Sequence, residues 1–484
     1  MPKILAAALL CAMIPAVLAA ADTPAAATAA TNPLLAPWPG AYGGVPPFDQ
    51  IKPALFPPAL EAALAERRAE IAAIKNNPEK PTFANTIEAL ERAGSTFARV
   101  GSMYGTWSGS LKDDAFAAVE RDWSPKLSAA NDEILLDTAL FARIQAVWDS
   151  PEKAKLTPEQ SRLLWRTYNN FSRLGAKLGP QEKERLTAIN QELAGLYTGF
   201  GQKVLADEDS WIVLDSEADL AGLPQGVIDG LKAAAEERKL EGKWAVVNTR
   251  SVVDPYLTYS SRRDLREKVW KAFKSRGDNG NDNDTNATIA KILPLRAEKA
   301  HLLGYPNYAA WKLSNTMAAT PERARALMET VWKPTVERVH EEVADLQAIA
   351  QKETPGITIE PWDYLYYAEK VRKAKYDVDQ NELKPYFNLE SMIQASMFMA
   401  NKVYGLKLTE VTGEVPVFQP DVRVWKVTDE KSGKLVGLFY GDYFARPGKG
   451  SGAWENAYRQ QANFGGQVLP LVSNNNNFVK GKPG

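Results

Sequence analysis

Amphipathic segments of helix length constrain the fold of this chain more than any other sequence feature. Leu186, Ile189, Leu193 and Leu196 recur at spacings of three, four and three residues, which places them on one face of a helix. Pro180 stands just before this stripe, where the first turn of a helix tolerates it. Similar mixtures of apolar and charged residues fill four more segments, at 54–74, 113–130, 225–238 and 260–275. Together these patterns predict a mainly α-helical protein.

A sixth helix is predicted to start at Pro321, with Thr320 as its N-cap, and to run to about Gln351. Pro334 lies inside this segment and has no N–H to donate. It is therefore expected to kink the helix or to split it in two.

Strand patterns are few. Two short apolar runs, at 211–214 and 244–247, and a hairpin late in the chain are predicted as strands. The hairpin would pair 422–427 with 435–440 across a turn-rich segment at 429–433. The acidic, Asn-rich segment 278–286 is expected to be a loop. An EF-type calcium loop would need a Glu at its twelfth position, where counting from Asp278 gives Ile289.

The first residues are predicted to be a signal that directs the protein to export. Lys3 precedes an apolar run from Ile4 to Leu18, and three alanines end it, as in a secretory signal peptide covering residues 1–21. The run is shorter than the ~20 residues of a membrane span, although an uncleaved anchor is the alternative. Residues 22–47, rich in Ala and Pro, are expected to form a flexible lead-in, with 33–47 non-helical. This interpretation places the protein in the periplasm of a bacterium.

Charge and composition exclude several functions. The 58 basic and 59 acidic residues give a net charge of −1, which argues against binding to nucleic acid or to an anionic membrane. One cysteine, Cys11, excludes an internal disulfide and a cysteine zinc cage. The nearest match to the zinc motif H-E-x-x-H begins at His340 but has Ala344 where the second His should be. We expect His340 on the polar face of its helix and His301, the only other histidine, at a helix end as a capping or partly buried residue.

The glycine-rich segment 448–452 matches no nucleophile or phosphate motif. Ser451 lacks the flanking glycines of G-x-S-x-G, because Lys449 and Ala453 occupy those positions. Gly448-Lys449 is followed by Gly450 rather than Ser or Thr, so a phosphate loop is also excluded. A mobile loop or a close approach of two backbones is the better interpretation.

Four stretches, in order along the chain, resemble the thimet oligopeptidase and oligopeptidase A family of zinc peptidases, and most closely its bacterial peptidyl-dipeptidase branch. They include Asn76-Asn77-Pro78 with Pro81-Thr82-Phe83, Leu295-Arg296-Ala297-Glu298-Lys299 with Leu302-Leu303-Gly304-Tyr305, Pro361-Trp362-Asp363 with Glu369-Lys370, and Leu438-Phe439-Tyr440 with Asp442, Ala445-Arg446-Pro447-Gly448-Lys449 and Gly452-Ala453-Trp454. The resemblance runs from about Asn32 to the last residue.

The resemblance implies a mainly α, clam-like metallopeptidase body with a small β-sheet near a deep cleft and zinc on the cleft floor. Its substrates would be oligopeptides, from whose C-termini this branch releases dipeptides. Residues 48–250 would form the N-terminal helical domain, and 251–484 would begin the catalytic domain. Substrate-cleft residues are expected at Phe439, Tyr440, Asp442 and Arg446, although these side chains and Trp454 could instead only fold the loop. Pairing of an extended peptide with an edge strand would be a physical role for this sheet.

The resemblance also exposes a gap. In the family the zinc helix follows the part that resembles 469–484, and the printed chain contains no H-E-x-x-H. We therefore expect an incomplete catalytic domain, no catalytic or metal-ligating residue, no bound zinc and no hydrolysis by this chain alone. A second polypeptide, the missing C-terminal catalytic half, could complete the site. The alternatives are a non-catalytic helical protein that binds peptides or a partner, and a fragment that does not persist in the cell.

Overall fold

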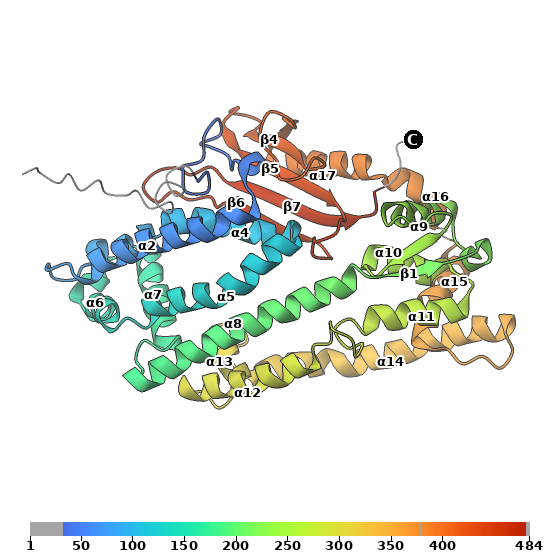
Figure 1. The fold of residues 1–484 in the computed structure, drawn as a ribbon, viewed down its shortest axis with the longest axis horizontal. Helices are drawn as coiled ribbons and strands as arrows, with labels where there is room; N and C mark the ends of the chain where they lie inside the picture. Colours follow the sequence, from blue (N-terminus) through green and yellow to red (C-terminus); the bar gives the residue numbers. More distant parts are fainter. Residues whose placement is uncertain (1–31, 378–379, 481–484) are drawn as a thin grey trace, which may run out of the picture.

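The structure is a computed structural model, and it describes residues 32–377 and 380–480. The α-helices are α2 (Phe56–Lys75), α3 (Ala89–Arg92), α4 (Ser95–Ser110), α5 (Asp114–Leu135), α6 (Thr138–Trp148), α7 (Pro158–Arg173), α8 (Pro180–Glu208), α9 (Gln225–Glu237), α10 (Arg250–Tyr259), α11 (Arg263–Lys274), α12 (Asn286–Leu302), α13 (Tyr308–Leu313), α14 (Pro321–Glu353), α15 (Tyr364–Tyr376), α16 (Gln380–Leu383) and α17 (Leu389–Tyr404). The strands are β1 (Trp211–Leu214), β2 (Trp244–Val247), β3 (Leu406–Glu410), β4 (Arg423–Asp429), β5 (Leu435–Phe444), β6 (Trp454–Arg459) and β7 (Leu471–Phe478). The predicted mainly α class is confirmed (Figure 1).

The helices follow the predicted periodicity. Helices α2, α5, α8, α9 and α11 coincide with the five predicted segments, and α8 buries Leu186, Ile189 and Leu193 of its stripe. The predicted N-cap of α14 is confirmed, because the Thr320 side chain accepts a hydrogen bond from the Arg323 N–H at 3.3 Å. The predicted split at Pro334 is wrong, since α14 runs through it as one helix. Pro334 and Thr330, four residues earlier, are both exposed, so water can satisfy the carbonyl that the proline leaves unpaired.

The described residues form two sheets. Strands β1 and β2 pair antiparallel at the two predicted positions. The second sheet has five strands in the order β3-β4-β5-β7-β6, in which β5 and β7 are parallel and the other pairs antiparallel. Its β4–β5 hairpin confirms the prediction, and the Gly433 N–H closes the turn on the Asp429 carbonyl at 2.9 Å. Strands β3, β6 and β7 were not predicted. The pattern of β7 is polar, because it includes Ser473-Asn474-Asn475-Asn476-Asn477.

The largest buried cluster joins the N-terminal helices to this second sheet, which lies beside α2 and α4 in Figure 1. Phe48 links the two parts, with its ring 5.3 Å from that of Tyr458 and 6.3 Å from that of Tyr440. The cluster's members come from both ends of the chain, and they include Leu34, Phe56, Leu60, Val100, Met103, Phe116, Val424, Leu438, Tyr440 and Leu471. The sheet is therefore anchored on the N-terminal helices by shared apolar burial.

The predictions for residues 1–47 can be compared with the structure only in part. Residues 1–21 and 22–31, the predicted signal peptide and the start of the lead-in, lie outside the described residues. Residues 33–47 form turns and extended backbone without a helix, as predicted. In the part of the chain that the structure describes, no helix combines the length and the apolar character that crossing a bilayer requires.

Candidate functional site

The predicted cleft residues lie on both faces of β5 and in the loop after it. Tyr440 and Asp442 point toward the N-terminal helices and are buried, with exposed fractions of 0% and 1%. Phe439 is half-buried on the opposite face, where its ring lies 5.8 Å from that of Trp425. Burial raises the pKa of the Tyr440 hydroxyl. Whether these residues contact a substrate stays a prediction, but the geometry already gives Tyr440 and Asp442 a role inside the fold.

Asp442 is the centre of a buried ion-pair cluster. Arg446 grips its carboxylate with two nitrogen atoms at 2.7 and 2.8 Å, and the Lys449 Nζ lies 3.0 Å from the same carboxylate. Arg446 also donates two hydrogen bonds to the carbonyl of Ser110, at the end of α4. The fork of the guanidinium thus holds β5 and α4 at a fixed distance.

Lys449 was missed as a candidate in the sequence, although it stands between two glycines. Its Nζ donates to the carbonyls of Asp442, Phe444 and Asn476 at 3.0, 2.9 and 2.6 Å. Burial lowers the pKa of Lys449 to about 8. A buried ammonium that has four oxygen partners fixes the loop after β5 against β7.

The close backbone approach predicted for the glycine-rich segment is confirmed. Gly448 accepts a hydrogen bond from the Lys112 N–H at 3.0 Å, and the Gly450 N–H donates to the Gly109 carbonyl at 3.0 Å. Gly448 has φ +74°, and a Cβ at this position would lie 2.4 Å from the Lys112 carbonyl oxygen. Only glycine fits there. We call this contact, made by Ser110, Lys112, Asp442, Arg446, Gly448 and Lys449, the seam between the sheet and the N-terminal helices.

A hollow of about 480 Å³ opens beside the seam, between the end of α8, helices α9 and α10, and the sheet. Arg446 and Lys449 line one side of it, and Asp209 and Arg238 line the other. Burial raises the pKa of the Asp209 carboxyl. Of the predicted cleft residues, Arg446 is the one that reaches this hollow.

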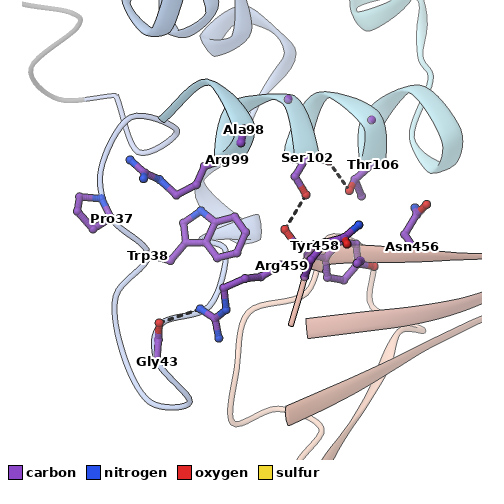
Figure 2. Close-up of a pocket in the computed structure, with 14 residues that line it drawn as sticks. Pro37, Trp38, Gly43, Ala98, Arg99, Ser102, Thr106, Asn456, Tyr458 and Arg459 are labelled. Carbon is purple, nitrogen blue, oxygen red and sulfur yellow. Dashed lines mark hydrogen bonds between the residues drawn. The ribbon is translucent and has the colours of Figure 1, made fainter. Parts of the chain in front are cut away.

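A larger hollow of about 700 Å³ lies between α4 and the edge strand β6 (Figure 2). Helix α4 contributes Gly101 and Gly105, where a Cβ would meet no atom within 4 Å. Ser102 donates to the Tyr458 carbonyl of β6 at 2.9 Å, while Trp38 forms another wall. Glycine inside a helix costs about 1 kcal/mol relative to alanine, so these two residues preserve space at the expense of helix stability.

Arg459 closes this hollow at the end of β6. Its guanidinium donates to the carbonyls of Leu469 at 2.6 Å, of Gly43 and Gly44 at 2.8 Å each, and of Tyr42 at 2.7 Å. Burial lowers the pKa of this arginine. The arrangement ties the segment before α2 to β6, and no sequence pattern pointed to it.

The residues of the described chain do not fit a zinc site. They contain no cluster of three or more His, Cys, Asp or Glu side chains that could hold a metal ion. His301 lies at the C-terminal end of α12, where its Nε2 is 3.1 Å from the Pro306 carbonyl. His340 is exposed on α14, as predicted for the polar face of that helix. No chemical step at a metal can therefore be assigned to these side chains.

Comparison with known proteins gives one family. The sequence matches the model of peptidase family M3 over residues 256–484. It is 37% identical to dipeptidyl carboxypeptidase of Escherichia coli (strain K12) over 437 residues, which are 90% of this chain and 64% of that protein. It is 36% identical over 452 residues to the protein of the same name from Salmonella typhimurium, covering 93% of this chain and 66% of that protein. Oligopeptidase A of Escherichia coli is 28% identical over 463 residues, covering 94% of this chain and 67% of that protein. The chain thus spans slightly less than two thirds of both dipeptidyl carboxypeptidases.

Proposed function

Because this chain belongs to the thimet oligopeptidase and oligopeptidase A family of M3 peptidases, we propose that it is part of a zinc-dependent peptidase that releases dipeptides from the C-termini of oligopeptides. The observation that carries this proposal is the 37% identity over 437 residues to a dipeptidyl carboxypeptidase. The identity to that protein is higher than the 28% to oligopeptidase A, which favours dipeptide release as the reaction.

The substrate would lie in an extended conformation along the outer edge of β6. As an edge strand, β6 pairs on one side with β7 and directs its second row of backbone groups toward α4. The hollow between α4 and β6 provides space there, since Gly101 and Gly105 keep the helix surface flat. Main-chain pairing of this kind binds a peptide through hydrogen bonds that do not depend on its side chains, which suits a peptidase that accepts many sequences.

Phe439, Tyr440, Asp442 and Arg446 keep distinct parts in this proposal. Arg446 lines the smaller hollow and is the one of the four best placed to meet a substrate carboxylate or carbonyl. Tyr440 and Asp442 are buried and act by positioning β5 and Arg446. Phe439 supports the opposite face of the sheet against Trp425.

Residues 48–250 would supply one wall of the peptide channel, and 251–484 would supply the beginning of the catalytic domain. Zinc would be held by residues outside the printed sequence, either in a continuation of the same chain or in a second polypeptide. The two histidines support this placement, because His301 and His340 lie on different helices and neither joins a cluster of metal-binding side chains in the described residues. We also propose export to the periplasm after removal of residues 1–21.

The test begins with the protein isolated from its native cell. Its intact mass, its N-terminal residue, its zinc content and its release of dipeptides from an oligopeptide with a free C-terminus would be measured together. We expect one zinc per molecule, cleavage that a chelator abolishes, and loss of cleavage when the peptide C-terminus is amidated. Residues 22–484 purified alone serve as the control and should neither bind zinc stoichiometrically nor hydrolyse the peptide.

Two outcomes would contradict this proposal in different ways. No hydrolysis by the native protein would remove the peptidase function. Chelator-sensitive hydrolysis by residues 22–484 alone would instead show that the metal site lies within the printed chain.

A further inference from the structure

The side chains on the first two thirds of helix α14 are mostly exposed, with little packing around them. The helix spans Pro321–Glu353, yet nearly all side chains from residue 322 to residue 341 are exposed. Several of these exposed side chains are large and apolar: Leu327, Met328, Val331, Trp332 and Val339, with Leu327 71% and Trp332 69% exposed. A cluster of this kind marks an interaction surface, because isolated globular domains rarely leave contiguous apolar area uncovered.

Met328, Trp332 and Val339 belong to a stripe that is buried at its other end. Trp332, Val339 and Leu346 are spaced seven residues apart, and so are Val336, Val343 and Ala350. Leu346 and Ala350 are buried, with exposed fractions of 3% and 0%, in a cluster that includes Tyr367 of α15. A seven-residue repeat is the pattern of a helix that packs along its length against another helix. Helix α15 therefore covers only the C-terminal end of a surface built for a longer partner.

The polar side of α14 is already occupied by its own side chains. Arg338 forms ion pairs with Glu341 and Glu342, three and four residues further along the helix. These pairs keep the charged side of the helix in solvent. Leu327 and Val331 lie on this charged side, because they precede Arg338 by eleven and seven residues. The apolar stripe that lacks a partner is therefore the one that contains Met328, Trp332 and Val339.

We infer that an amphipathic α-helix lies along residues 327–343 of α14 and that it comes from the part of the M3 peptidase that this chain does not span. The inference rests on the proposed function. The chain is already matched over 90% of its length by a relative of which it covers only 64%, so the relative has a further third whose place in this fold is unassigned. The stripe of α14, which lies within the matched residues 256–484, offers that further third an apolar helix surface of matching chemistry.

Hydroxyl-radical footprinting of two preparations tests this inference. One is the protein isolated from its native cell, and the other is the 484-residue chain produced alone. We expect oxidation of Met328 and Trp332 to be about fivefold slower in the native protein, because a packed helix removes most of a Trp side chain from water. Met317, which is 98% exposed and lies before α14, is the internal control and should be oxidised equally in both.

Three outcomes would overturn the inference while leaving the peptidase assay to be judged separately. Equal oxidation of Met328 and Trp332 in both preparations would show that nothing covers the stripe. Protection in a native protein whose mass is a multiple of the printed chain would assign the stripe to a second copy. Protection already present in a monomer of the printed chain would assign it to residues of that chain.

A pair of substitutions in the full native reading frame gives an independent readout. Trp332→Glu places a charge on the stripe, and Lys333→Glu places the same residue on the neighbouring polar side of the same turn. We expect Trp332→Glu to lower the amount of active peptidase about tenfold, and Lys333→Glu to leave it within about twofold. Equal activity of the two variants would overturn the inference, and the printed chain carrying Trp332→Glu should still fold, because Trp332 contacts no core there.

Discussion

The seam and the exposed part of α14 differ in which kind of side chain is shielded from water. At the seam, charged groups are buried or half-buried: Asp442 and Lys449 are removed from water, Arg446 is half-buried, and each has several partners within 3.1 Å. On α14, apolar groups such as Trp332 and Leu327 remain in water. The seam is therefore a finished interface, whose charged groups are paired within this chain. The α14 stripe is an interface with one side only.

This difference separates what holds the described chain together from what it can offer to something else. Substitutions at the seam should cost stability, because each leaves a buried group unpaired or displaces backbone. Substitutions on the exposed part of α14 should cost almost nothing in the chain by itself, since there is no packing to lose. Four measurements on the 484-residue chain would sharpen or break this contrast.

The largest effect is expected for Asp442→Asn. The variant leaves the cations of Arg446 and Lys449 without their carboxylate, and we expect the free energy of unfolding to fall by about 3–5 kcal/mol. Urea unfolding followed by circular dichroism measures the loss. The control is Asp421→Asn, whose partner Lys480 is exposed, and which should lower stability by less than about 1 kcal/mol. Equal effects of the two substitutions would show that the seam is no stronger than a surface ion pair.

The second effect concerns the backbone at Gly448. Gly448→Ala puts a Cβ 2.4 Å from the Lys112 carbonyl oxygen at a φ of +74°, so the seam must open or the backbone must shift. We expect a loss of about 2–3 kcal/mol in the same urea assay. Gly452→Ala is the matched control, because Gly452 has φ +92° but a Cβ there would meet no atom within 4 Å, and it should lose only about 1 kcal/mol. If Gly452→Ala lost as much, the cost would come from φ alone and not from the close approach.

The third effect is a pH dependence that belongs to Lys449. Its pKa is about 8 in the folded chain and about 10.4 in an unfolded one, so between these values the unfolded state binds more protons. Stability contributed by this residue is lowest below pH 8 and rises as the pH increases through that window. We expect the stability of the natural chain relative to Lys449→Met to increase by about 1 kcal/mol from pH 7 to pH 9.

A constant stability difference between the natural chain and Lys449→Met over this pH range would contradict the expectation. It would mean that the Lys449 ammonium titrates in the folded chain as it does in water.

The smallest effect is expected on α14. Val339→Ala removes apolar atoms that are 43% exposed and should change the free energy of unfolding by less than about 0.5 kcal/mol. Leu346→Ala, seven residues further along the same stripe, should lose about 2–5 kcal/mol, because Leu346 is buried against α15. A large loss for Val339→Ala in the isolated chain would show that the stripe is already covered there.

The helices could be predicted because their determinants are local. The stripe of α8 and the N-cap of α14 each depend on residues within a few turns, and both were found where the sequence places them. Pro334 was expected to kink the helix or to split it, and of these two alternatives the split is wrong. A lost hydrogen bond costs little stability on a helix surface that water can reach. Whether a helix surface is exposed cannot be predicted from the local sequence.

Strands β6 and β7 were missed because their pairing depends on residues outside the local sequence. The alternation that marks a half-buried strand is absent from a run of one serine and four asparagines, yet Ser473 and Asn475 are buried there. Their partners are the earlier strands β5 and β6 and, in the loop between those two strands, Lys449, which donates to the Asn476 carbonyl. The seam was only partly foreseen: a close backbone approach at Gly448 followed from the glycines, but the burial of Lys449 did not.

The sequence by itself determined the mainly helical class, the positions of six helices, the β4–β5 hairpin and the resemblance to a peptidase family. Each of these depends on periodicity, caps, turn residues or motifs within short stretches of chain. The tertiary structure alone decided that Asp442 is a buried anchor, that Gly101 and Gly105 face a hollow, and that the stripe of α14 is half covered. Burial and pairing between distant segments depend on how the elements pack. The sequence of a single strand or helix does not specify which other elements it contacts.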